Sequence, residues 1–351
     1  TEVSDESRPE LKALGRPVVK GEICDPSGKR IDSFNGWLSL TLFDAEHSQT
    51  TEGRGDDGES VTFDEKGERL FSGRTSVTDG LFEITIPMPS EVAENYRPAT
   101  MTLFAAADDG TEATGVSRNL YVYGFDYDAE TDNVPPVIES LYLDHESFRP
   151  SDVVGANPVL IARVRDDVAL NMSNLGIGHQ MSLRIDNDLN LTDISNGYTP
   201  DIDGSPTGSI FYRLPELSAG NHTATLRIWD TAGNSASASI DFFVNPDLAP
   251  RIFDIYSDAN PALTQANFYV THNRPDATLT VRIEVYDLNG KLLWDSQTTG
   301  RADMYASAPV TWNLTDRAGS KVTRGIYLYK TTVTTGGQSS TMTKRIAVAP
   351  L

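Results

Sequence analysis

The sequence predicts an all-β protein built from tandem β-sandwich domains. Short runs with the two-residue alternation typical of strands recur along its 351 residues, and turn residues separate them. No long segment repeats apolar residues at helical spacing, and no run approaches the ~18 apolar residues of a membrane span. At roughly one domain per 150 residues, two or three domains are expected, each with its own core.

Two proline-containing segments divide the chain into three predicted domains. Residues 124–136, GFDYDAETDNVPP, are acidic and end in Pro-Pro, which cannot join a sheet ladder. Residues 245–250, NPDLAP, form a second predicted hinge. The predicted domains are therefore residues 1–133, 134–246 and 247–351.

The first domain is expected to form a β-sandwich. The segment from His47 to Asp64 is too rich in Gly, Asp and Glu to be buried, so a long surface loop is predicted there. Residues 71–82 then return the chain to the sheet. The strand-like runs are Val18–Ile23, Trp37–Phe43, Leu81–Met88, Met101–Ala107 and Asn119–Tyr123.

The middle domain is predicted to be immunoglobulin-like. Two long strands, GNHTATLRIW and SASASIDFFV, flank a turn at Asp230–Asn234, and both alternate apolar with polar residues. The stretch Asn174–His179, NLGIGH, contains Gly-x-Gly. No strand–turn–helix unit surrounds it, so a dinucleotide-binding loop is not predicted.

The last domain carries the strongest turn signal. Asn289-Gly290 lies between two alternating apolar runs and predicts a hairpin with a type I′ turn. Gly319 and Gly325 are predicted as further structural turn positions. Seven strand-like segments are expected, and the last one, TKRIAVAPL, lies at the edge of its sheet unless the strands rearrange.

Charge is distributed unevenly along the chain, whose net charge is −21. Residues 1–133 hold 27 acids and 12 bases, residues 134–246 hold 14 and 6, and residues 247–351 hold 9 and 11. The acidic body argues against nucleic acid and anionic membranes as partners, because both need basic residues. The near-neutral last domain is expected to make a different contact, with its own docking partner.

Catalytic chemistry is not predicted. The single cysteine, Cys24, excludes an internal disulfide, and neither a nearby histidine nor an oxyanion-hole glycine motif accompanies it. A structural role for Cys24 is therefore favoured over that of a nucleophile.

Three acidic pairs and two tryptophans are alternative site candidates. The acidic pairs could act as acid and base or hold Ca²⁺, but solvated turn acids are the favoured interpretation, and no cofactor or metal is expected. Trp37 or Trp312 could stack on sugar, although core packing is favoured for both. The acidic pairs are Asp166-Asp167, Asp186/Asp188 and Asp201/Asp203.

The order of motifs in the last domain closely resembles a known family. DLNGKLLW, TWNLTDRAGS, RGIYLYK and TKRIAV follow one another as in the C-terminal domains recognised by the type IX secretion system of Bacteroidetes. From about Gly15 onward the chain is similar to the non-catalytic C-terminal half of the gingipain-type cysteine peptidases that serve as type IX secretion sortases. In that family a catalytic Cys-His domain precedes these domains. The chain begins without Met or a signal segment, so it is expected to be a mature piece or a fragment.

The resemblance implies a function for the parent protein and a role for this chain. The parent would remove the C-terminal signal domains of exported cargo at the cell surface, on the outer leaflet of the outer membrane, after export through the periplasm. It would then attach the cargo to anionic lipopolysaccharide. This chain would be the stalk and docking region, binding the outer-membrane β-barrel protein PorV and other components of the attachment complex.

The residues expected to contact the partner lie on the last strand. They are Lys344, Arg345, Ile346 and Val348. The alternative hypothesis is a surface adhesin or carbohydrate-binding cargo protein that uses the same export domain.

Overall fold

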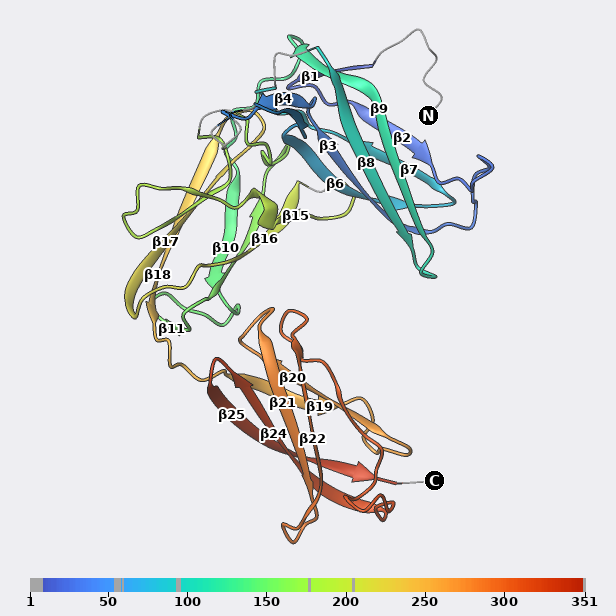
Figure 1. The fold of residues 1–351 in the computed structure, drawn as a ribbon, viewed down its shortest axis with the longest axis vertical. Helices are drawn as coiled ribbons and strands as arrows, with labels where there is room; N and C mark the ends of the chain where they lie inside the picture. Colours follow the sequence, from blue (N-terminus) through green and yellow to red (C-terminus); the bar gives the residue numbers. More distant parts are fainter. Residues whose placement is uncertain are drawn as a thin grey trace. The chain divides into compact units, whose positions relative to one another are not determined.

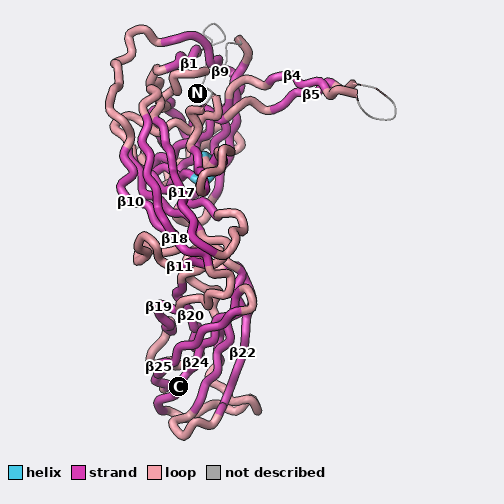
Figure 2. The backbone as a smooth tube through the Cα atoms, turned by 90° about the vertical axis from the view of Figure 1, so that its left-hand side faces the viewer, coloured by secondary structure: helices cyan, strands magenta, loops and turns pink. Residues whose placement is uncertain are grey.

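The computed structural model describes residues 9–53, 58, 60–92, 96–175, 178–203 and 206–349. In these ranges the regular structure consists of β-strands and one short 3₁₀ turn, η1 (Ser195–Gly197), which confirms the predicted all-β fold class. Figure 2 shows strands along the whole length of the described chain. The same ranges contain no helix that is long and apolar enough to cross a membrane.

The first part of the chain forms a five-stranded sheet and a two-stranded sheet (Figure 1). The orders are β1-β9-β8-β3-β6 and β2-β7. Leu38, Leu40 and Leu42 on β3 are at most 1% exposed, so alternation fixes one face of this strand in the core. The strands are β1 (Glu10–Ala13), β2 (Val18–Glu22), β3 (Gly36–Phe43), β6 (Arg69–Val77), β7 (Leu81–Thr85), β8 (Pro98–Ala107) and β9 (Glu112–Phe125).

The segment from His47 to Asp64 differs from the predicted surface loop. Its ends pair as the antiparallel strands β4 (His47–Thr50) and β5 (Thr62–Glu65), and Figure 2 shows this ribbon projecting from the sheet. Polar cross-strand contacts join the two strands, including a 2.9 Å hydrogen bond between the hydroxyl groups of Thr50 and Thr62. The prediction failed because it relied on apolar alternation, which an exposed ribbon does not need.

The middle part forms two further sheets. Their orders are β10-β12-β16-β15 and β11-β18-β17-β13-β14. Leu226 and Ile228 on β17 and Phe242 on β18 are at most 1% exposed, so the predicted apolar face of this hairpin is confirmed. The strands are β10 (Val137–Leu143), β11 (Val153–Val154), β12 (Val159–Arg165), β13 (Ser182–Ile185), β14 (Thr192–Asp193), β15 (Tyr198–Pro200), β16 (Thr207–Arg213), β17 (Gly220–Trp229) and β18 (Ser235–Val244).

The last part, here called the C-terminal module (residues 251–349), contains seven strands, as predicted. The sheet orders are β19-β20-β23 and β22-β21-β24-β25. Phe268, Trp312 and Tyr329 pack together in its core, and Trp312 is 0% exposed. The strands are β19 (Ile252–Ser257), β20 (Ala266–His272), β21 (Thr278–Tyr286), β22 (Leu292–Arg301), β23 (Val310–Trp312), β24 (Gly325–Thr335) and β25 (Gln338–Val348).

Contacts divide the chain into two compact units. Unit 1 comprises Thr1–Leu141, Ile161–Tyr212 and Thr223–Ile240. Unit 2 comprises Tyr142–Leu160, Arg213–His222 and Asp241–Leu351. Both units include part of the predicted middle domain, so the two predicted boundaries at the proline segments stay predictions.

Four tight turns share an Asp-x-x-Gly-x sequence in which the Asp carboxylate accepts two backbone N–H groups. In the turn after β21, Asp287 Oδ1 accepts the N–H groups of Asn289 and Lys291, each at 2.9 Å. In each turn the glycine has a positive φ, which costs little without a Cβ. The other three turns begin at Asp25, Asp230 and Asp316.

The hairpin at Asn289-Gly290 forms, but its predicted turn type is wrong. Only Gly290 has a positive φ, of 82°, and its N–H donates to the Asp287 carbonyl at 3.1 Å. The turn therefore spans Asp287–Gly290 as type I, and Gly290, its last residue, adopts the left-handed conformation. The Asp287 carboxylate favours this longer loop because it binds two of the loop's N–H groups.

Of the two other glycines predicted at turns, one lies in a turn and the other begins a strand. Gly319 lies in a turn with a φ of 82°, whereas Gly325 is the first residue of β24 and pairs with Val348. Two successive residues with positive φ, the pattern of a type I′ turn, occur at Gly336-Gly337 between β24 and β25. The Gly-Gly pair was the signal in the sequence for this turn.

Replacing Gly290 by valine is expected to destabilise the C-terminal module by about 1–3 kcal/mol, because a β-branched residue would have to adopt a positive φ. No atom lies within 4 Å of the added Cβ position, so the cost comes from the backbone alone. Calorimetry should show a lower melting temperature for the transition of this module. Gly325→Val is the matched control, because Gly325 lies in a strand without positive φ. Equal melting of both variants would contradict the turn assignment.

Candidate functional site

The four predicted partner-binding residues of β25 do not form one surface. Lys344 and Arg345 are exposed, and the Lys344 ammonium forms an ion pair with Asp254 on β19. Ile346 and Val348 are 1% and 2% exposed and belong to the core of the C-terminal module. In the folded module, a partner could therefore contact only the first two of these side chains.

The backbone of β25 offers a second kind of contact. As expected, β25 is the edge strand of its sheet. The Ala347 N–H donates to Asn260 Oδ1, and the Ala347 carbonyl accepts the N–H of Ala262. These bonds point away from β24. Because the backbone groups of successive residues point alternately to the two sides of a strand, the N–H and carbonyl groups of Ser339, Thr341, Thr343 and Arg345 also point away from β24. No backbone hydrogen bond from these four residues to another described segment is present, so this edge could accept an added strand.

Cys24 lies in surroundings that oppose thiolate formation. Its thiol contacts Glu22 Oε1 at 3.6 Å, and its backbone forms a bridge to Arg30. Partial burial, and then the charges of Glu22 and Asp25, raise the pKa of the Cys24 thiol. A reactive cysteine needs a positive neighbour or a base, so the structural role expected for Cys24 fits this environment.

The five histidines lie apart from Cys24 and have other contacts. His47 lies beside Glu65, and the Nε2 atom of His222 lies 2.9 Å from the Ser218 carbonyl. The His145 ring packs at a tilt against Phe253, with ring centroids 4.1 Å apart, and the His179 ring packs at a tilt against Trp229, with centroids 4.4 Å apart. In the described part of the chain, no Cys-His pair is therefore present. Gly176 and Ile177, of the NLGIGH stretch, lie outside the described residues.

His272 is fully buried in the C-terminal module. Its Nδ1 atom accepts the N–H of Arg274 at 3.1 Å, while its Nε2 atom is buried with no hydrogen-bond partner in the described part of the chain. Burial, with a smaller effect from the Arg274 charge, lowers the pKa of His272 to about 4. The neutral imidazole is therefore the form that the fold requires.

Two of the three predicted acidic pairs bind other protein groups. Asp201 forms an ion pair with Arg163 and accepts the Thr207 hydroxyl. Asp203 Oδ1 accepts the Ser76 N–H, and Asp203 Oδ2 accepts its hydroxyl at 2.9 Å. Asp186 and Asp188 accept backbone N–H groups of Thr223 and Asn190. The carboxylates of both pairs thus already accept hydrogen bonds from other protein groups. Gly204, the last residue of the stretch Asp201–Gly204 whose sequence resembles the start of a calcium loop, lies outside the described residues.

Neither tryptophan named as a sugar platform is freely exposed. Trp312 is 0% exposed, and its Nε1–H donates to the Thr315 carbonyl at 2.8 Å. Trp37 is half-buried, and the Arg74 guanidinium lies 4.2 Å from the centre of its ring. Both rings therefore already have protein partners.

The described residues thus define a protein of tandem β-sandwich domains without a Cys-His pair. No protein-family model and no curated protein matches this chain. Among solved structures, it is similar to dimeric latent PorU from Porphyromonas gingivalis, at 30% identity over 98% of this chain and with a TM-score of 0.41. The chain covers 32% of that PorU chain, so the similarity concerns a PorU-like region only.

Two other solved structures resemble the chain more weakly. A tetra-tandem repeat from the extending region of a large adhesion protein is 15% identical over 96% of this chain and 71% of its own, with a TM-score of 0.23. An I-band fragment of titin is 12% identical over 97% of this chain and 95% of its own, with a TM-score of 0.21. Neither similarity is strong enough to indicate a function.

The burial of neutral His272 predicts acid sensitivity. Because its pKa is about 4 when folded and about 6.5 when unfolded, its contribution is present above pH 6.5 and is lost as the pH falls toward 4, by about 3 kcal/mol in total. His272→Gln should therefore lose less unfolding free energy than the wild type between pH 7 and 4.5, as measured by urea unfolding. His47→Gln, at an exposed site, is the control and should behave as the wild type. Parallel pH curves for all three proteins would refute this role.

Proposed function

We propose that this chain is the non-catalytic stalk and docking region of a type IX secretion sortase. The observation that carries the proposal is the order of four motifs in the C-terminal module, which fall on β21–β22, β23 with the turn after it, β24 and β25. The 30% identity to PorU, spread over 98% of this chain, supports it at the level of sequence. The parent protein would be a cysteine peptidase that removes cargo signal domains and attaches the cargo to anionic lipopolysaccharide.

The proposal assigns catalysis to a domain outside this chain. The acidic surroundings of Cys24 and the separate contacts of the histidines support this division. A thiol without a base or an orienting group loses most of its catalytic power.

Purified residues 1–351 are therefore expected to have neither peptidase nor transferase activity. A peptide substrate of the family and a thiol-directed probe would be incubated with the wild type and with Cys24→Ser. We expect equal background turnover for both proteins. Turnover by the wild type that disappears in Cys24→Ser would overturn this assignment.

The docking role is assigned to the edge of the C-terminal module, at the cell surface. Lys344 and Arg345 are exposed at this edge, and the outward peptide groups of β25 can add hydrogen bonds to a partner strand. The partner is expected to be the outer-membrane β-barrel protein PorV. The predominance of basic over acidic residues in 247–351, 11 against 9, sets this module apart from the acidic body.

Reversing both charges, Lys344→Glu with Arg345→Glu, is expected to weaken co-purification with the barrel about tenfold or more, because like charges would then oppose the partner. Surface ion pairs contribute little stability, so the variant should stay folded. Deletion of residues 343–351 is a poorer test, because it also removes Ile346 and Val348 from the core.

The matched control is Lys291→Glu with Lys321→Glu, which changes the charge by the same amount at two exposed positions beside tight turns. Undiminished capture of the first variant, or binding by residues 1–246 alone, would place the docking surface elsewhere. Binding to glycans without binding to the barrel would instead favour the adhesin alternative.

A further inference from the structure

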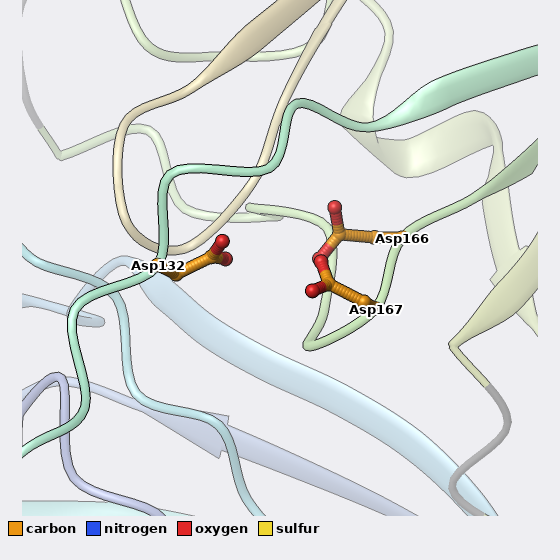
Figure 3. A group of neighbouring side chains, drawn as sticks. All are labelled: Asp132, Asp166 and Asp167. Carbon is orange, nitrogen blue, oxygen red and sulfur yellow. The ribbon is translucent and has the colours of Figure 1, made fainter.

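Three aspartates of unit 1 gather from two segments of the chain. Asp132 belongs to the segment between β9 and β10, and Asp166 and Asp167 follow β12 directly. One carboxylate oxygen from each lies within 4.8 Å of those of the other two. Figure 3 shows the carboxylate groups of the two segments pointing toward one another.

Two of these carboxylates each keep one oxygen buried and unpartnered. Asp166 is 3% exposed; its Oδ2 atom accepts the Val168 N–H at 2.9 Å, while its Oδ1 atom has no hydrogen-bond partner among the described residues. Asp132 repeats this arrangement: its Oδ1 atom accepts the Val134 N–H at 2.8 Å, and its Oδ2 atom is buried without a partner in the same part of the chain. In each residue a backbone N–H thus holds one carboxylate oxygen and leaves the other buried and unpaired within the described ranges.

The negative charge of the cluster is not balanced by the described protein groups. Among the described residues, no lysine or arginine forms an ion pair with any of the three, although Arg16 lines the same surface groove as Asp132 and Asp167. Asp230 lies close enough to add repulsion, and its own oxygens are occupied by the turn Asp230–Asn234. Burial, and then the charges of Asp230 and Asp167, raise the pKa of Asp166 to about 6. Buried carboxylates without a partner are costly, so the arrangement calls for a cation.

We propose that Asp132, Asp166 and Asp167 bind one Ca²⁺ ion. Calcium takes six to eight oxygen ligands in flexible geometry, whereas Mg²⁺ needs a near-ideal octahedron. Three carboxylates can supply part of this set, and the groove beside Asp132 and Asp167 gives water access to the remaining positions. An open site of this kind is expected to have a dissociation constant of about 10⁻⁴–10⁻³ M, as in extracellular modules.

The ion would join the acidic segment 126–134 to the turn after β12. Two hydrogen bonds already hold that segment: the Asp126 N–H donates to the Ala13 carbonyl at 3.0 Å, and the Asn234 side-chain amide donates to the Asp132 carbonyl at 3.3 Å. Binding would therefore stabilise unit 1 by linkage. This inference is independent of the proposed secretion role, because it uses only contacts within unit 1.

The test measures thermal unfolding of the full chain at pH 7 in EGTA and in 5 mM CaCl₂. Wild-type protein is expected to melt roughly 2–5 °C higher in calcium. Asp166→Asn should melt higher than the wild type in EGTA, because it removes a buried charge, and should lose the response to calcium. Asp132→Asn should lose the response as well.

Two controls make the result specific. Asp188→Asn changes an exposed turn aspartate outside the cluster and should keep the full response. Magnesium chloride at 5 mM should give at most a small shift. The proposal is wrong if calcium leaves the wild-type melting temperature unchanged, if Asp166→Asn keeps the response, or if magnesium acts equally well. Titration calorimetry with CaCl₂ should give one site per chain in the wild type and none in Asp166→Asn. This comparison does not need the Asp132→Asn variant to fold.

Discussion

A hydrogen bond from the backbone to an aspartate carboxylate holds the tight turns on which the sheets depend. At Asp25, Asp230, Asp287 and Asp316, one carboxylate oxygen accepts the N–H groups two and four residues further along the chain. This arrangement fixes the loop length, and loop length fixes which strand residues face each other. With a single cysteine there is no disulfide to correct a shifted register, so turns and cores must specify it together.

The sequence allowed the fold class and most strands to be predicted, but less of the sites. Alternation identified β3 and β17 because each buries one face in a core, and it missed β4 and β5 because neither alternates apolar with polar residues. The turn type at Asn289-Gly290 was missed because Asp287, two residues earlier, decides it. Alternation put Ile346 and Val348 on one face of the last strand, but it could not say whether this apolar face packs on the module's own core or on a partner, since either surface would bury it.

Two buried aspartates of this acidic chain differ in the charges of their neighbours. Asp144 is buried with its Oδ1 atom accepting the Val159 N–H at 2.9 Å and with Arg274 Nη1 at 3.5 Å from Oδ2. Burial raises the pKa of Asp144 to about 6, although Val159 and Arg274 oppose the shift. Asp166 has a comparable pKa, but no cationic group of the described residues pairs with it, and the nearby charges of Asp230 and Asp167 raise its pKa further. The first is an ion pair completed within the chain, whereas the second requires a ligand. Spacing in the sequence alone could not distinguish them, because the decisive neighbours of each are distant in sequence.

The incomplete pairing of β25 also bears on self-association. Ala347, near its end, is hydrogen-bonded to Asn260 and Ala262, while the outward peptide groups from Ser339 to Arg345 form no backbone hydrogen bond to another described segment. If such an edge were flat and apolar, strands of other copies of the chain could pair with it and form aggregates. Here threonines and serines alternate along the edge, and Lys344 and Arg345 place charge beside it. Charged residues beside an edge strand oppose pairing between copies of a chain, and Lys344 and Arg345 occupy such positions here.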